Sequence, residues 1–222
     1  MTLPRCGGGL ACTQYNADGT RAPVRTLLRD TSVFNSYMMS KVQLDGQFEA
    51  GKVGNSFRRY EAEGVKWLVL SMELWPRQQV LDWAKTVVAS NPTYNVIIVT
   101  HSLLNSDRTI NTTNGGYGST TSQAIYDQLI LAYPNVKMAF SGHVKGTANR
   151  IDTGVNGNKV ITFLTCFHSN EFNPSRFLTV DVLNGSVSSQ IRYSTKLTGS
   201  TAVDPNYQQY DAIVSGLSFI RS

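Results

Sequence analysis

Short apolar runs alternate with helical patterns through the middle of this 222-residue chain. Residues 66–70, 96–99 and 136–140 are apolar enough, and short enough, to be strands buried on both faces of a sheet. Between them, apolar side chains recur at helical spacing over 77–90 and 122–133, as in helices that pack one face on a core. Strands that alternate with helices in this way predict a parallel sheet with helical crossovers, and therefore an α/β fold.

The segments on either side of this pattern do not alternate between strands and helices. Asn184-Gly185 is a dipeptide typical of two-residue hairpin turns, and β-branched runs precede and follow it. No shift in composition marks a second domain, so we expect a single domain over residues 1–222. The other expected elements are a loop-rich lead-in over 1–30, a short helix near 31–39, strands at 56–60, 159–166, 176–183 and 186–193, and a weakly ordered tail over 197–222.

The composition excludes several classes of protein. No apolar run approaches the roughly 20 residues of a membrane-spanning helix, so no membrane span is expected. The net charge is +5, but the basic residues are scattered, which disfavours a nucleic acid partner. Charged residues make up 16% of the chain, below the roughly 25% of an average globular protein. Ser, Thr, Asn and Gly supply the polarity instead, which suggests an extracellular or cell-surface location, although the chain has no signal-peptide pattern.

The three cysteines are too few for a disulfide scaffold. Cys6 and Cys12 are near enough in sequence for a local bridge, and three free thiols are an equal alternative. The two lie in a glycine-rich stretch with no partner pair downstream, which is not the spacing of a zinc site.

Two of the three histidines directly follow predicted strands. His101 comes after the strand at 96–99, and His143 comes after the strand at 136–140. Neighbouring parallel strands end at one edge of a sheet, where ligands bind, so we expect both imidazoles there. Imidazole is a good ligand for zinc, manganese or iron, whereas many strand-end histidines only hydrogen-bond a loop. His168 either faces the same cleft or caps a turn.

Three segments, taken together in their order and spacing, resemble the C-terminal half of calcineurin-like metallophosphoesterases. They are Trp67–Ala84 (WLVLSMELWPRQQVLDWA), Val96–Leu104 (VIIVTHSLL) and Phe140–Gly146 (FSGHVKG). In that family one strand ends in Thr-His, and the last parallel strand ends in Gly-His-x-His. The loop at 114–118 and the segments at 167–170 and 173–176 resemble secreted bacterial members. The resemblance covers about residues 25–195 and implies a β-sandwich flanked by helices, here incomplete on its N-terminal side.

The resemblance also implies roles for individual residues. His101 and His143 correspond to two ligands of one metal, so a divalent Mn, Fe or Zn ion is the implied cofactor, at one site rather than the family's two. Lys145 stands where the second histidine of Gly-His-x-His belongs; its ammonium offers a metal no lone pair and suits a substrate phosphate oxygen instead. Asn114 is a second candidate substrate contact, although turn chemistry explains it equally well. Glu73 either orients a metal-binding histidine or bonds to backbone at the strand end.

The family's other ligand motifs are absent from the 222 residues: no Asp-x-His, Gly-Asp-x-x-Asp or Gly-Asn-His-Asp/Glu occurs. The catalytic histidine has no candidate, so the catalytic residues are unknown. Hydrolysis in that family depends on two metal ions. We therefore expect a metal-dependent phosphoric ester hydrolase that is truncated or degenerate, with weak or no activity alone. Met1 then falls just after the missing half of the site.

A catalytically inactive binding or structural module on the same fold is the alternative, favoured by Lys145 and by the absent motifs. A phosphate ester is the expected ligand of an active form. An incomplete sandwich would also expose an apolar strand edge, and we expect a protein partner to cover it.

Overall fold

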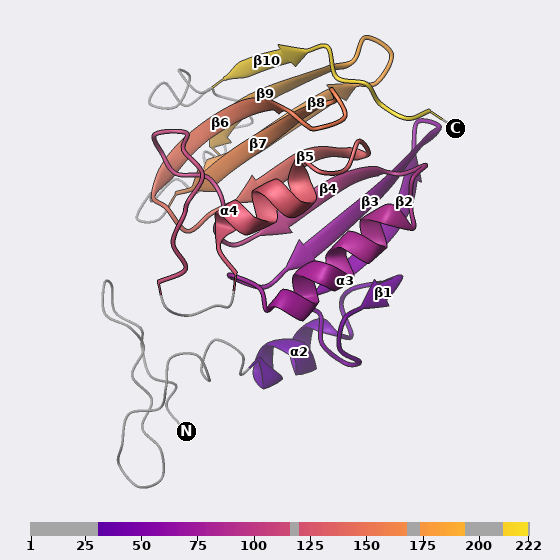
Figure 1. The fold of residues 1–222 in the computed structure, drawn as a ribbon, viewed down its shortest axis with the longest axis vertical. Helices are drawn as coiled ribbons and strands as arrows, with labels where there is room; N and C mark the ends of the chain where they lie inside the picture. The colour runs from indigo at the N-terminus through magenta and orange to yellow at the C-terminus, as the bar shows by residue number, and fades with distance from the viewer. Residues whose placement is uncertain (1–30, 116–119, 168–173, 194–210, 222) are drawn as a thin grey trace, which may run out of the picture.

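The computed structural model describes residues 31–115, 120–167, 174–193 and 211–221 (Figure 1). Over these residues the chain forms a mixed seven-stranded sheet, a three-stranded sheet and a few helices, which confirms the predicted α/β class. The expected lead-in at 1–30 lies outside the described residues, as do His168, Cys6 and Cys12. Among the described residues, no helix is long and apolar enough to cross a membrane.

The large sheet has the strand order β1-β2-β3-β4-β5-β7-β6. β3, β4 and β5 run parallel, as the alternation of strands and helices predicted, and β7 joins them in the same direction. β1, β2 and β6 pair antiparallel at the two sides. The small sheet is antiparallel, in the order β10-β9-β8. The bounds are β1 Gly46–Gln47, β2 Ser56–Ala62, β3 Val65–Met72, β4 Asn95–Thr100, β5 Val136–Ser141, β6 Gly146–Thr153, β7 Lys159–Cys166, β8 Pro174–Asp181, β9 Ser186–Tyr193 and β10 Ala212–Ser215.

The two faces of the large sheet are covered by different layers. Along β3, Leu68 and Leu70 pack toward the helices, whereas Val65 and Trp67 pack with residues of the small sheet. The helices of the first face are α3 (Gln78–Ala89) and α4 (Ser122–Ile125), which the π-helix η1 (Tyr126–Ile130) extends (Figure 1). The molecule therefore has one apolar core on each side of the large sheet. A short helix, α2 (Ser32–Met38), precedes these elements where the sequence predicted one.

Local chemistry explains the bounds of α3, which agree with the predicted 77–90. Its buried side chains are those at helical spacing, Val80, Leu81, Ala84, Val87 and Val88. The helix ends where the buried side chain of Asn91 donates a hydrogen bond of 2.7 Å to the Val87 carbonyl. That bond satisfies a carbonyl that the last turn leaves without a helical partner.

The connection between β8 and β9 is longer than predicted. Asp181 pairs with Ser186, so four residues form the turn and the expected two-residue turn at Asn184-Gly185 is wrong. The Asp181 carboxylate accepts hydrogen bonds from the Asn184 backbone at 2.9 Å and from its side chain at 2.7 Å. These bonds close the wider turn, and Gly185 takes up the left-handed backbone (φ 62°) that it needs.

Two other expectations about element bounds are wrong in part. The helix predicted over 122–133 ends at Ile130, after its last turn widens from α to π geometry. The tail predicted to be weakly ordered contains β10, which pairs with β9 and buries Val214 against the large sheet. Residues 197–210 of that tail lie outside the described residues.

Substitution of two adjacent residues of β4, Ile98 and Val99, tests how the two faces of the strand are covered. Ile98 is fully buried on the helix side, whereas Val99 points to the opposite face and keeps 36% of its surface exposed. Ile98→Ala should lower the free energy of unfolding by about 2–5 kcal/mol, because it leaves a cavity in a close-packed core. Val99→Ala should cost less than about 1 kcal/mol. Urea denaturation followed by circular dichroism measures both, and equal losses would contradict the assignment of the faces.

Candidate functional site

The structure brings His101 and His143 together. His101 directly follows β4, and His143 follows β5 after Gly142. β4 and β5 are parallel neighbours, so both imidazoles lie at the carboxyl edge of the large sheet, as the sequence predicted. Their ring centroids are 5.1 Å apart, with an interplanar angle of 67°. Both residues are exposed at the surface, where a ligand could reach their ring nitrogens.

The backbone around His143 holds its ring in place. His143 has a positive φ of 66°, a left-handed conformation that costs a non-glycine residue about 1–2 kcal/mol. Just before it, the Gly142 amide donates a hydrogen bond of 3.0 Å to the His101 carbonyl. This bond ties the ends of the two strands together. Strained, well-supported backbone of this kind is concentrated at functional sites.

Trp75 also packs against His143. The residue is 3% exposed, and its ring meets the His143 imidazole edge-on, with centroids 5.4 Å apart. Trp75 lies in the connection from β3 to α3 and also has a positive φ, of 42°. The imidazole of His143 therefore contacts the rings of both Trp75 and His101.

A pocket of about 430 Å³ opens beside His101 at the carboxyl ends of β3, β4, β5 and β7. Four of its described lining residues carry hydroxyl groups, and His101 is the one titratable side chain among those described residues. Of the hydroxyls, Ser141 is already engaged, since it accepts a hydrogen bond of 3.2 Å from the Leu104 amide. The lining residues are Ser71, Met72, Val99, Thr100, His101, Phe140, Ser141, Gly142 and Thr165.

Arg176 places a positive charge behind this pocket, a feature that the sequence did not single out. Its Nε donates a hydrogen bond of 2.8 Å to the hydroxyl of Thr165, which lines the pocket. Its other nitrogens bond to Thr147, Ser189 and the Leu164 carbonyl. All these partners are neutral, and burial lowers the pKa of Arg176 to about 10, although Asp211 opposes the shift.

Glu73 joins a polar network at the start of α3. Its carboxylate accepts hydrogen bonds from the Asn55 side chain and from Arg77 Nε, both at 3.0 Å, and from the Arg77 backbone at 3.1 Å. Arg77 in turn donates to Glu49 at 2.7 Å. The backbone-bonding alternative for Glu73 therefore describes an observed contact, whereas its role in orienting a metal-binding histidine stays a prediction. The network fixes the segment that carries Trp75.

The remaining predicted site residues within the described ranges are Lys145 and Asn114. Lys145 is exposed in the connection from β5 to β6, two residues after His143. Asn114 is half-buried in the loop that leads to residues 116–119, which lie outside the described residues. Over the described ranges, no group of three or more His, Cys, Asp or Glu side chains could hold a metal ion. A metal at His101 and His143 would therefore have two protein ligands from this part of the chain.

No protein-family model matches the sequence, and no curated protein matches it. The functional inference therefore depends on the residues and geometry described above.

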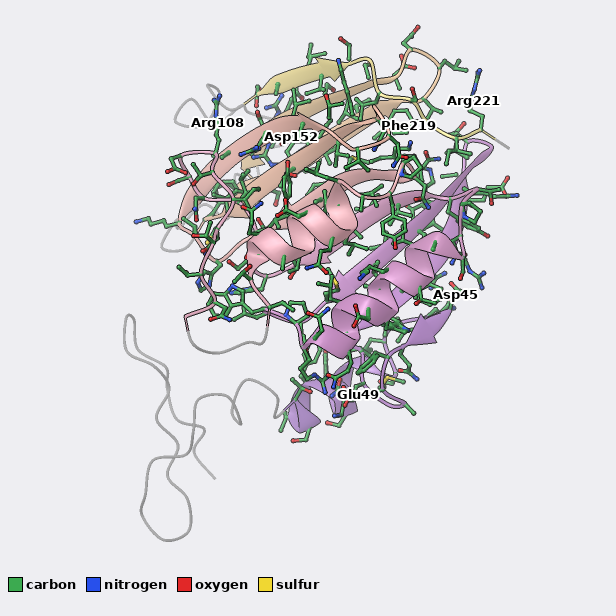
Figure 2. All side chains as sticks on the ribbon, in the orientation of Figure 1. Asp45, Glu49, Arg108, Asp152, Phe219 and Arg221 are labelled. Carbon is green, nitrogen blue, oxygen red and sulfur yellow. The ribbon has the colours of Figure 1, made fainter. Side chains whose placement is uncertain are left out.

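Glu49, which lies beside α2 (Figure 2), is the member of this polar network whose substitution tests how strongly the network is held. Its hydrogen bond from Arg77 is the main reason that its pKa falls from 4.5 to about 2. A carboxylate with a depressed pKa stabilises the fold above its unfolded-state pKa, and this stabilisation is lost as the pH falls toward the folded-state value. Glu49→Gln should therefore reduce the loss of unfolding free energy between about pH 5 and about pH 2.5, by about 1 kcal/mol after solvent screening.

Urea denaturation at the two pH values measures this difference. Lys52→Met is the matched control, because Lys52 also contacts Glu49, at 3.1 Å, but is itself 48% exposed. It should keep most of the wild-type pH dependence. An unchanged pH dependence in Glu49→Gln would contradict the proposed strength of the Glu49–Arg77 pair.

Proposed function

We propose that this chain is a metal-dependent phosphoric ester hydrolase of the calcineurin-like metallophosphoesterase type, with weak or no activity by itself. The observation that carries the proposal is the pairing of His101 and His143 at the carboxyl edge of the parallel strands, 5.1 Å apart. Two exposed imidazoles at that position suit a shared metal ion better than a structural role, because neither is needed to complete the apolar core.

The architecture is compatible with the proposed family. Two sheets pack face to face, and the helices lie on the outer face of the larger one. This agrees with the β-sandwich flanked by helices that the resemblance implies. The order of the Thr-His and Gly-His segments along β4 and β5 agrees with it as well.

The residues present fit a divalent ion, but in an incomplete set. Neutral imidazoles are suitable ligands for Mn, Fe or Zn, and catalytic sites usually supply three or more protein ligands. Two ligands imply weak binding. When bound, such an ion would supply Lewis-acid stabilisation of a phosphoryl oxygen. The chain's own contribution is to hold and orient the ligands: Trp75 and the bond between Gly142 and His101 keep the two rings in place.

The charges around the pocket favour an anionic substrate. Arg176 stands behind Thr165 with neutral hydrogen-bonding partners, so its charge is felt in the pocket. Lys145 adds an exposed cation close in sequence to His143. A lysine attracts a phosphate as a point charge and does not need to touch the metal.

A catalytically inactive binding module on the same fold is the second candidate. Two observations favour it: Lys145 replaces a histidine ligand, and the described residues offer no group of three ligands. Such a module would bind a phosphate ester or a metal without turning over. The two candidates share the site and differ in the reaction.

Metal titration tests the site. Calorimetry with Zn²⁺ or Mn²⁺ should show weak binding of one ion to the chain. His101→Ala and His143→Ala should each reduce the affinity at least about tenfold, as disruption of a metal site typically does. Ser106→Ala, an exposed side chain of the following loop, is the matched control and should bind like the wild type. Unchanged binding in both histidine variants would contradict the proposal.

An assay of aryl phosphate hydrolysis distinguishes the two candidates. We expect metal-dependent turnover that is slow because the metal has few protein ligands. Both histidine variants should abolish this turnover. Complete absence of turnover with intact metal binding would support the binding module. Rapid turnover would contradict the expectation of weak activity.

A further inference from the structure

A second pocket lies at the opposite end of the large sheet from the histidines. It has a volume of about 520 Å³, within the range of about 300–1,000 Å³ that is usual for small-molecule sites. It opens near the beginning of β5, whereas His143 follows the end of that strand. Its walls come from the end of α3, the connection after η1, the turn between β6 and β7, and the C-terminal segment that carries Phe219 (Figure 2).

The C-terminal wall is held firmly in place. The Asn95 side chain donates a hydrogen bond of 2.8 Å to the Ile220 carbonyl and accepts one of 2.9 Å from the Ile220 amide. The ring of Phe219 lies 5.8 Å from that of Trp67. The pocket is therefore built by residues far apart in the sequence, and its shape does not depend on a single loose loop.

Of the described residues that line the pocket, Lys137 is the one that carries a charge. The residue is 3% exposed, and its Nζ donates a hydrogen bond of 2.7 Å to the Pro134 carbonyl. An ammonium has three N–H donors, and Pro134 is the one acceptor that the described part of the chain offers it. In that part of the chain, no carboxylate lies within ion-pair distance of Lys137 Nζ. Burial also lowers the pKa of Lys137.

The nearby carbonyls already have other donors. The Asn135 side chain donates to the carbonyls of Val88, at 3.1 Å, and Asn91, at 3.0 Å. The Asn156 side chain donates to the Ala132 carbonyl at 3.1 Å. The carbonyls at the C-terminal ends of α3 and η1 thus already accept hydrogen bonds from these asparagine side chains. Within the described ranges the buried ammonium thus has no carboxylate as a counter-charge, and a buried charge is costly unless it is paired.

We propose that this pocket binds a small monoanionic ligand with a flat apolar body, such as an aromatic carboxylate. Its carboxylate would pair with Lys137 Nζ, and its body would pack between Pro92, Tyr133 and Phe219. A single cation in an otherwise neutral pocket matches a single negative charge. The largely apolar walls match a ligand that is hydrophobic elsewhere. This site is independent of the histidine pair and of the proposed hydrolase activity.

Titration with naphthoate and its neutral analogue naphthamide tests the proposal in the full chain. The wild type should bind naphthoate at least about tenfold more tightly than naphthamide, as expected for a hydrogen bond to a charged group. Lys137→Met should lose this preference. Lys159→Met, which removes a neighbouring but exposed cation outside the lining, should keep it.

Ala89→Trp provides a second variant that leaves Lys137 intact. Ala89 is an exposed lining residue at the end of α3, so a large side chain there should fill the pocket and weaken both probes. The proposal is overturned if the wild type binds no naphthoate, or if folded Lys137→Met keeps the preference for it. If Lys137→Met does not fold, Ala89→Trp decides, because a folded variant that binds naphthoate like the wild type also overturns it.

Discussion

Parallel pairing of β4 with β5 is the constraint on which the candidate site depends. Val96 lies opposite Val136, and Val99 lies opposite Phe140, so the two strands reach the same edge of the sheet. Packing on both faces fixes this alignment, because a shift in register by one residue would move every side chain to the opposite face, into a core packed for other side chains. The pairing of the two strands therefore brings His101 and His143 together. The site is in this sense a consequence of packing in the middle of the molecule.

The parts of the fold that were predictable from the sequence are those encoded locally. Apolar runs marked β3, β4, β5 and β7, and helical spacing marked α3, because each pattern is contained in the segment itself. The meeting of His101 and His143 followed from strand direction alone. β6 was not predicted, since its sequence (GTANRIDT) is polar and its pairing with β7 is what makes it a strand. β10 (AIVS) was missed although three of its four residues are apolar, because a segment this short gives little local signal and its pairing with β9 is what makes it a strand.

The contacts that shape the two pockets were not predictable, because they join residues far apart in the chain. Nothing around Arg176 in the sequence indicates that it reaches Thr165 and Thr147 across the sandwich. Lys137 is a similar case: a lysine inside a strand is usually exposed, and here the bulge beside β4 and the C-terminal segment bury it. The prediction of a two-residue turn at Asn184-Gly185 was wrong because the Asp181 side chain closes a wider loop. It does so by accepting a hydrogen bond from the Asn184 backbone, a contact that the preference of a dipeptide for a turn does not include.

The two ends of the large sheet thus present different chemistry. The carboxyl edge has two exposed imidazoles and a pocket whose lining includes both hydroxyl and apolar side chains, with a guanidinium behind it. The opposite end has one buried ammonium in a mostly apolar pocket. Both ends depend on the same central strands. Loss of packing around β4 and β5 would therefore disturb both sites together.

Anomalous diffraction from crystals of the full chain soaked in Zn²⁺ tests the central claim most directly, because it locates the metal without relying on activity. The account predicts an anomalous peak within bonding distance of ring nitrogens of both His101 and His143, about 2.0–2.1 Å from each. Ordered zinc bound elsewhere on the protein, with no peak between the two imidazoles, would contradict it.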